Sequence, residues 1–233
     1  MRRRMIMGGL SAKDYVQNGL LLHLDGIENA GYGRHDSEAS AWIDLTGNHT
    51  VVSSRTVTTA SGQAPTWTNN AAWMRGDYAY ATNFIPDILA AVNNNNCTIE
   101  IIWNYLSRGS VNNSGFFLMN ADSPSGVRGF YFFDNANNCI SSYSYRQTGY
   151  VSVSSGKSWT IIRSLLNGNK IVFNNKQYVN SNTGTVTSDE AFFASCSNCY
   201  IYAVRIYDRV LTADELAKNK NIDEKRFGIT IPQ

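Results

Sequence analysis

The junction between a strand and a helix near the end of the chain limits the possible folds more than any other segment. Residues 199–207 mix branched, small and aromatic side chains, a composition typical of a half-buried strand. Thr212 and Glu215 have the spacing of a capping box, in which the side chain of each accepts a hydrogen bond from the backbone N–H of the other. We therefore expect the strand to end shortly before Thr212 and a helix to begin at Ala213.

Turn-forming residues divide the middle of the chain. Clusters of Asn, Asp, Gly and Ser recur between residues 44 and 184, and β-branched or aromatic runs separate them. This pattern predicts many short antiparallel strands. Asn167 and Gly168 favour a hairpin with a type I′ turn, which pairs residues 163–166 with 170–173. A short helix is predicted at 86–92, where a proline takes an allowed first-turn position.

Length and charge restrict the class of protein. The chain has 233 residues, of which 43% are hydrophobic and 16% charged, and its formal net charge is +2. This length suits a single all-β domain with a substantial core. No apolar run approaches the roughly 18 residues of a membrane span, so no span is expected. The small net charge provides no broad field for a polyanion, and nucleic acid is not an expected partner.

Several segments resemble one family. Residues 199–216 are similar to the closing strand and the "R-I-Y-x-R-x-L-[ST]-x-x-E-[IL]" tail of LamG-like jelly rolls, in the concanavalin A-like lectin/glucanase superfamily. Residues 18–26 resemble the opening strand of that family, and residues 41–48 its "W-x-D-L-[ST]-G-N" turn. Weaker similarity at 71–82, 98–105 and 159–178 extends the resemblance over residues 15–228.

The resemblance implies an all-β fold, a concanavalin A-like jelly-roll β-sandwich of two antiparallel sheets with a short C-terminal helix. It divides the chain into a basic N-terminal arm at 1–14, a LamG-like jelly-roll domain at 15–212, and a C-terminal helix and tail at 213–233 packed on the domain.

The arm begins with Arg2, Arg3 and Arg4, followed by an apolar stretch that is too short and too interrupted by glycine for a classical signal peptide. One interpretation is a disordered basic arm. Another is that the three arginines dock on an acidic neighbour in an assembly. The first residues also resemble the starts of structural proteins carried by phages and prophages of gut bacteria, which implies a virion or a bacterial cell surface.

Catalytic patterns are not found in the sequence. Retaining glycoside hydrolases need two carboxylates about 5 Å apart, but Glu100 is the single carboxylate on its predicted strand. We therefore expect Glu100 to be a solvated or paired group on the surface. Asp214 and Glu215 suit a helix N-terminus, and no serine lies in a Gly-x-Ser-x-Gly elbow. We expect a protein that is not an enzyme, in which Arg205 is a pairing group at a strand end.

Histidine and cysteine give few further signals. His23 and Asp25 share a strand face, which is typical of a hydrogen-bonded pair, with a metal or acid/base role as the alternative. The cysteines are Cys97, Cys139, Cys196 and Cys199. They are expected as reduced thiols, or with a bridge from Cys97 or Cys139 to the 196–199 segment. Zinc would require all four to meet.

Many relatives of the resembled family hold calcium at a loop rim. By motif position, the candidates here are Asp25, Asp44, Asn48 and Asp208. Calcium takes six to eight oxygen ligands, which would have to converge from three separate segments. An Asx-type turn is the alternative role for Asp44 and Asn48.

Glycan binding is the function that the resemblance favours, because this superfamily stacks sugars on aromatic rings. Tyr143, Tyr145 and Arg146 are candidates because Ser and Gln surround them, and Trp67 and Tyr32 are further candidates. Each ring could instead belong to the core. We expect a non-catalytic carbohydrate-binding or adhesion module displayed on a phage particle or bacterial cell surface. The alternative is a purely structural virion or assembly protein that uses the jelly roll for protein–protein contacts, including contacts between copies.

Overall fold

The structure is a computed structural model. It describes residues 9–48, 50–52, 66–74, 80–83, 86–93, 96–108, 114–119, 129–134, 139–144, 146–152, 158–164, 169–173, 176–180, 190–195 and 197–231. Most described side chains belong to residues 9–48, 66–73, 96–104 and 199–231.

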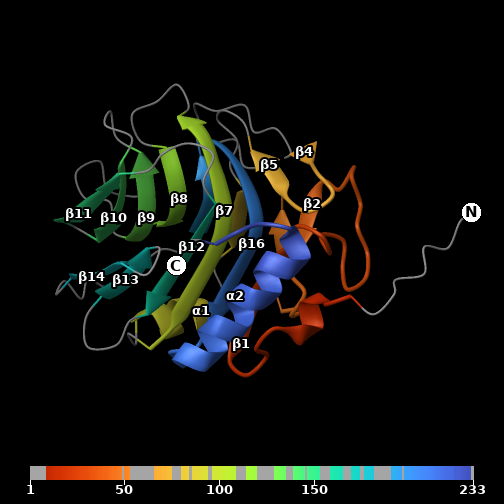
Figure 1. Ribbon diagram of the computed structural model, residues 1–233, viewed down its shortest axis with the longest axis horizontal. Coiled ribbons are helices and arrows are strands. Elements are labelled where there is room, and N and C mark those ends of the chain that lie inside the picture. The colour runs from red at the N-terminus through yellow and green to blue at the C-terminus, as the bar shows by residue number, and fades with distance from the viewer. Residues whose placement is uncertain are drawn as a thin grey trace, which may run out of the picture.

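Short strands make up most of the described chain (Figure 1). They are β1 (Leu20–Asp25), β2 (Ala41–Ile43), β3 (Thr50–Val52), β4 (Thr66–Trp67), β5 (Ala72–Met74), β6 (Tyr80–Asn83), β7 (Thr98–Arg108), β8 (Ser114–Met119), β9 (Gly129–Asp134), β10 (Cys139–Ser144), β11 (Arg146–Ser152), β12 (Ser158–Ser164), β13 (Asn169–Phe173), β14 (Lys176–Asn180), β15 (Glu190–Ser195) and β16 (Ser197–Tyr207). The helices are η1 (Ala12–Asp14, a 3-10 helix), α1 (Pro86–Asn93) and α2 (Ala213–Phe227). A largely antiparallel β-fold with a C-terminal helix is therefore confirmed, as is the helix predicted at 86–92.

The strands form two antiparallel sheets. One sheet has the order β14-β13-β12-β7-β16-β5-β4, with β1 also paired to β16, and the other has the order β11-β10-β9-β8-β15-β6-β3-β2. Along one edge β16 pairs with β7, and along its other edge it pairs with β5 near Cys199 and with β1 near Tyr207. The closing strand of the chain thus joins three other strands of the first sheet.

A polar row runs across β7, β16 and β1, and the rows on either side of it point to the opposite face. Residues opposite each other in an antiparallel pair point to the same face, and their chain neighbours point to the other. Glu100 lies opposite Arg205, which in turn lies opposite His23. The neighbouring rows are apolar: Ile101, Val204 and Leu24 form one, and Ile99, Ile206 and Leu22 the other.

Helix α2 covers the polar face. It lies across β7 and β16 in Figure 1, and residues 201–207 are all buried. The prediction of a half-buried strand at 199–207 is therefore wrong, because the helix shields the face that would otherwise meet water. The domain boundaries at residues 14 and 212 stay predictions, although Ala12 of η1 is fully buried.

The predicted capping box sets the start of α2. The Thr212 side chain accepts from the Glu215 N–H at 3.3 Å, and the Glu215 carboxylate accepts from the Thr212 N–H at 2.9 Å. The helix begins at Ala213 as predicted and ends at Phe227, where Gly228 forms the C-cap with a φ of 66°, a left-handed conformation that glycine adopts without steric cost. The last residue of the helix, Phe227, and Ile231 of the tail pack against the first sheet. They form a buried apolar cluster with Ala71, Ile102, Tyr202 and Ala203.

The predicted hairpin forms, but in a different register. Strands β12 and β13 are antiparallel, with Ser164 opposite Lys170 and Arg163 opposite Ile171. The prediction paired residues 163–166 with 170–173, whereas the observed partners of 170–173 are residues 161–164, so the strand pairing is confirmed with a shift. The predicted turn residues Asn167 and Gly168 lie outside the described residues, and the type I′ turn stays a prediction.

Candidate functional site

The polar row beneath α2 is a buried ion-pair network. The Arg205 guanidinium donates to Glu100 Oε2 at 2.7 Å and to both Asp223 carboxylate oxygens, at 2.8 and 2.6 Å. These three side chains are at most 1% exposed. Arg205 was expected to be a strand-end pairing group and Glu100 a surface carboxylate. Both are instead buried, because α2 supplies Asp223 as the second anionic partner.

Further polar contacts tie other segments to this network. The Asn219 amide donates to Glu100 Oε2 at 2.8 Å and to the Tyr207 hydroxyl at 3.0 Å, while its oxygen accepts from the Val16 N–H at 3.1 Å. The Tyr15 hydroxyl donates to Asp223 at 2.7 Å. The chain segment before β1 is therefore held to α2 by side chains of the helix.

Tyr15 lies between two cations. The guanidinium carbon of Arg205 is 4.1 Å from the centre of its ring, and that of Arg226 is 5.4 Å away. Both distances are within the range of cation–π attraction. Burial, together with the nearby Asp223 carboxylate, raises the pKa of Tyr15 well above its ordinary value. The phenol thus stays protonated and keeps donating to Asp223.

His23 and Asp25 have different partners than expected. The His23 Nε2 is 3.7 Å from the Asp25 carboxylate, too far for a hydrogen bond, and neither ring nitrogen has a hydrogen-bond partner. Burial lowers the pKa of His23, which favours the neutral imidazole. Asp25 is paired instead with Arg226 of α2. Burial alone would raise the pKa of Asp25, but His23 and Arg226 outweigh it and hold the pKa below its ordinary value.

The burial of this network decides its chemistry. A carboxylate pair, an imidazole and two guanidinium groups could serve acid–base catalysis at an open site, but here Glu100, Arg205, Asp223, His23 and Asp25 are at most 1% exposed. A substrate could not touch these groups while α2 is docked. Their contacts serve to fix α2 on the sheet.

The connection between β1 and β2 lies beside this network, and we refer to residues 26–40 as the 26–40 loop. It contains neither helix nor strand. Asp25 Oδ1 accepts from the Ile27 and Glu28 N–H groups, each at 2.9 Å. Glu28 then accepts from the Gly33 N–H at 3.0 Å, from the Ala12 N–H at 3.0 Å and from Arg226 at 3.0 Å. One carboxylate thus joins the loop, η1 and α2.

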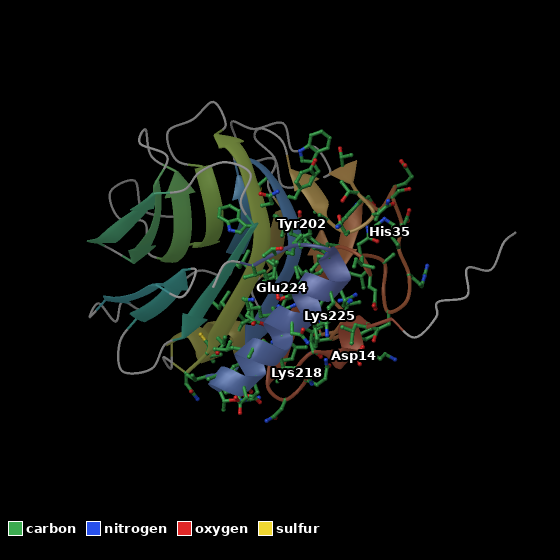
Figure 2. All side chains as sticks on the ribbon, viewed as in Figure 1. Asp14, His35, Tyr202, Lys218, Glu224 and Lys225 are labelled. Carbon is green, nitrogen blue, oxygen red and sulfur yellow. The ribbon has the colours of Figure 1, made fainter. Side chains whose placement is uncertain are left out.

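Reciprocal bonds close the outer part of the 26–40 loop. The Asn29 amide donates to the Asp36 carbonyl at 2.8 Å, and the Asp36 N–H donates to the Asn29 side-chain oxygen at 2.8 Å. The His35 Nδ1 is 3.1 Å from the Ile27 carbonyl. In Figure 2, His35 of this loop and Asp14 of η1 lie on the same side of the molecule. The loop is therefore organised by its own polar groups.

The 26–40 loop presents Tyr32 to solvent. Tyr32 is 37% exposed, and the Lys13 ammonium lies 4.9 Å from the centre of its ring. Gly31 and Gly33 on either side have φ values of 110° and 68°, and a Cβ at either position would meet nothing within 4 Å. The backbone around the ring is therefore uncrowded.

The predicted calcium ligands are not brought together. Asp25 ends β1, whereas the Asp208 N–H donates to the Gly19 carbonyl at 2.8 Å, just before the start of that strand. Six residues of extended chain separate these positions by roughly 20 Å, at about 3.3 Å per residue. One ion could not bind both. Among the residues that the structure describes, no group of three or more His, Cys, Asp or Glu side chains could hold a metal ion.

Asp44 makes the Asx-type turn that was the alternative to calcium. Its carboxylate accepts from the Thr46 N–H at 3.0 Å, from the Thr46 hydroxyl and from the His23 N–H at 2.9 Å. Asn48 is exposed, and its N–H donates to the Thr46 hydroxyl at 3.3 Å. These bonds fix the turn after β2 to β1. Calcium binding itself stays a prediction.

The predicted glycan-binding residues lie in three different places. Trp67 is 7% exposed, its Nε1 donates to the Ala39 carbonyl at 2.8 Å, and its ring stands edge-on to Trp42. It has the core role and offers little ring face to a sugar. Tyr143 and Arg146 lie on the paired strands β10 and β11, and Tyr145 lies outside the described residues. Tyr32 is the member of the set with an exposed, described ring.

Sequence reasoning missed Glu28 and the polar residues of α2 that enter the network. Asn219, Asp223 and Arg226 recur at helical spacing, and the same pattern is typical of a solvent-exposed helix face. A buried helix face can be told from a solvent-exposed one here only by the row of charged residues on the sheet that pairs with it. A signal was available in Glu100 and Arg205, which would both point to one face of adjacent strands.

The remaining expectations concern cysteine and membranes. Cys97 and Cys199 are buried, whereas the side chains of Cys139 and Cys196 lie outside the described residues. Burial raises the pKa of Cys199 to about 12. Within the described parts of the chain, no helix has the length and apolar character that crossing a bilayer requires.

No protein-family model matches the chain, and no curated protein matches it. Solved structures do match. A Trypanosoma rangeli sialidase is 12% identical with a TM-score of 0.60, and the match covers 90% of this chain and 33% of the sialidase. The chain therefore spans about a third of that enzyme.

Two further structures are domains that were solved in a complex, according to their titles. Domain 4 of a GH43 extracellular arabinanase from Geobacillus stearothermophilus, in complex with arabinotriose, is 16% identical with a TM-score of 0.57, and the match covers 84% of this chain and 96% of that domain. The binding domain of botulinum neurotoxin DC, in complex with rat synaptotagmin II, is 13% identical with a TM-score of 0.57. The match covers 90% of this chain and 52% of that one. At these identities the likeness concerns the fold alone.

Proposed function

We propose that this protein is a non-catalytic carbohydrate-binding or adhesion module built on a concanavalin A-like jelly-roll sandwich. The likeness to the arabinanase domain carries the proposal, because that match covers 96% of a separate domain that was solved with arabinotriose bound. The correspondence therefore concerns a complete domain rather than a fragment of a catalytic one. Fold likeness does not transfer a ligand by itself, so the sugar class must come from the site.

The arrangement of charged side chains favours binding over catalysis. The buried network beneath α2 consists of Glu100, Arg205, Asp223, Asp25 and Arg226, which bond to one another or to the backbone. Glycoside hydrolysis needs two carboxyl groups that flank the scissile bond in an open cleft. The carboxylates of this network are committed to holding the helix and the 26–40 loop.

A protein partner is the second candidate. The botulinum neurotoxin binding domain has a similar fold and was solved in complex with a protein, synaptotagmin II. By this alternative, the chain is a structural virion or assembly protein that uses the same scaffold for contacts with other proteins. Display on a phage particle or a bacterial cell surface belongs to both candidates and rests on the character of the first residues.

A glycan array with the full-length protein separates the two candidates. It should include arabino-oligosaccharides and be run with calcium and with a chelator. Specific binding to a set of related glycans supports the module. Clean absence of binding in both conditions would overturn it.

Truncation provides a second comparison. Removing residues 1–8 leaves the contacts of Ala12 and Lys13 in place. The proposed module should retain its glycan binding after this truncation. A structural protein anchored by its arm should instead lose its incorporation into particles.

A further inference from the structure

We infer that the 26–40 loop is the glycan-contact surface, with Tyr32 as the stacking platform and Glu28 as the residue that positions it. This inference rests on the proposed function and names the site of that function. It places ligand binding on the exposed side of the α2 network, not on Tyr143, Tyr145 and Arg146.

The organisation of the 26–40 loop is the first observation. Connections of this length without helix or strand are uncommon in compact domains and usually have a function. Here the side chains of Asp25 and Asn29 hold the backbone through hydrogen bonds of 2.8–2.9 Å. A loop already ordered before binding loses little conformational entropy when a ligand docks.

The second observation is the position of Glu28. This carboxylate is 6% exposed, so its negative charge requires a partner, which Arg226 provides. Its two oxygens accept from the Gly33 N–H, next to Tyr32, and from the Ala12 N–H, next to Lys13. The backbones that carry the ring and the ammonium are thus fixed by one side chain.

The third observation is the chemistry that Glu28 holds together. Sugars bind proteins by laying C–H groups on an aromatic face while their hydroxyls exchange hydrogen bonds with polar groups at its edge. Tyr32 supplies an exposed ring, and the Lys13 ammonium, with three N–H donors, lies over one face of that ring at 4.9 Å from its centre, so a sugar would stack on the opposite face. The residues on either side of Tyr32 are glycines, which carry no side chain that could cover the ring.

The charges of the exposed side chains determine which class of glycan the 26–40 loop suits. The exposed charged side chains of η1 and the 26–40 loop are Asp14, Asp36 and Glu38 against Lys13 and Arg34, an excess of one negative charge. A sugar that carries carboxylate or sulfate would be repelled by this excess of negative charge. The loop therefore suits a neutral, hydroxyl-rich oligosaccharide.

The test is a titration of the full-length protein with neutral oligosaccharides that the array identifies, alongside acidic ones. Tyr32→Ala should weaken binding of the neutral glycan about tenfold, as expected for the loss of one stacked ring. Tyr32→Phe keeps the ring and should bind within about twofold of the wild type. Tyr32 is exposed, so neither variant should alter the thermal unfolding midpoint.

Glu28 is tested against Asp214, an exposed carboxylate at the start of α2 and outside the loop. Glu28→Ala should weaken binding, Glu28→Gln should weaken it less because a carbonyl acceptor remains, and Asp214→Asn should leave it unchanged. Since Glu28 acts through both Tyr32 and Lys13, adding Glu28→Ala to the double variant Lys13→Ala/Tyr32→Ala should weaken binding no further. Losses that add in full would instead assign Glu28 a general structural role and overturn the positioning claim.

The outcomes separate the site from the function. Glycan binding that survives Tyr32→Ala unchanged overturns the inference and leaves the carbohydrate-binding module in place. A preference for acidic over neutral glycans also overturns the ligand class. No binding to any glycan by the wild-type protein overturns the proposed function, and the site with it.

Discussion

Arg205 of β16 and Asp223 of α2 form a bidentate ion pair, with both donor–acceptor distances at or below 2.8 Å and both side chains buried. The pair explains why a strongly charged row lies in the middle of a sheet. The fixed fork of the guanidinium matches a carboxylate in one orientation. The pair therefore sets the position of α2 on the sheet as well as attracting it.

Removing one partner of this pair should destabilise the protein strongly. Asp223→Ala leaves Arg205 buried with Glu100 alone, and loss of one member of a buried ion pair costs about 3–5 kcal/mol. Equilibrium denaturation measures the change in the free energy of unfolding. The matched control is Lys220→Gln, which removes the partly exposed pair with Glu224 on the same helix and should cost about 0.5 kcal/mol or less. Equal losses in the two variants would contradict a structural role for the network.

His23 should make stability depend on pH in the mildly acid range. Its pKa is lowered in the folded protein by burial, and Asp25, Tyr15, Arg205 and Arg226 face it. A lowered pKa means that the unfolded chain takes up the proton first, so stability is complete above about pH 6.5 and falls as the pH drops below it. The slope contributed by this one group reaches at most about 1.4 kcal/mol per pH unit.

Denaturation curves between pH 7.5 and 5.5 check this expectation. His23→Phe should flatten the decline, whereas the control His35→Asn should keep it, because His35 is exposed. The pKa of Glu100 is raised by burial, so its contribution has the opposite sign and is lost as the pH rises. Glu100 is present in both the wild type and His23→Phe, so its contribution cancels when their two pH profiles are compared. A decline of unchanged slope in His23→Phe would rule out His23 as its source.

The capping box of α2 gives a smaller effect. Thr212→Ala removes the acceptor for the Glu215 N–H and should lower the free energy of unfolding by about 1 kcal/mol. Thr212→Ser retains the hydroxyl and should change it little. Chemical denaturation of the three proteins makes the comparison. A Thr212→Ser variant as unstable as Thr212→Ala would show that the hydroxyl bond is not the cause.

Cys199 should be unreactive in the folded protein. It is fully buried, and burial raises its pKa to about 12, so the reactive thiolate is scarce at neutral pH. Alkylation followed by peptide mass spectrometry should find Cys199 unmodified under native conditions and modified in denaturant. Rapid native labelling would mean that β16 opens locally.

Local signals predicted much of the scaffold. The Thr212 and Glu215 pair fixed the start of α2 correctly because a capping box depends on residues three apart, and Pro86 marked the start of α1 for a similar reason. The hairpin register was harder, because Asn167 and Gly168 do not by themselves fix which residues of the two strands face each other. Turn residues alone do not determine how many residues the connection contains.

The candidate site was harder to predict from the sequence because its contacts join segments that are far apart along the chain. Glu100 reads as a surface carboxylate until Arg205 and Asp223 are known to meet it. Glu28 has no motif, and its role depends on Ala12, Gly33 and Arg226. Tyr32 could be identified as a candidate from its loop, but its exposure depends on how that loop is held.

Amide hydrogen exchange by NMR tests most directly whether α2 holds the 26–40 loop. Arg226→Gln removes the cation that neutralises Glu28, so the Glu28 carboxylate should rotate out of its buried position into solvent. It would then no longer accept hydrogen bonds from the Gly33 and Ala12 N–H groups. The control Lys225→Gln changes the adjacent, exposed residue labelled in Figure 2. Faster exchange at Gly33 and Ala12 in Arg226→Gln alone is the predicted result. Equal protection of these two amides in both variants would contradict it.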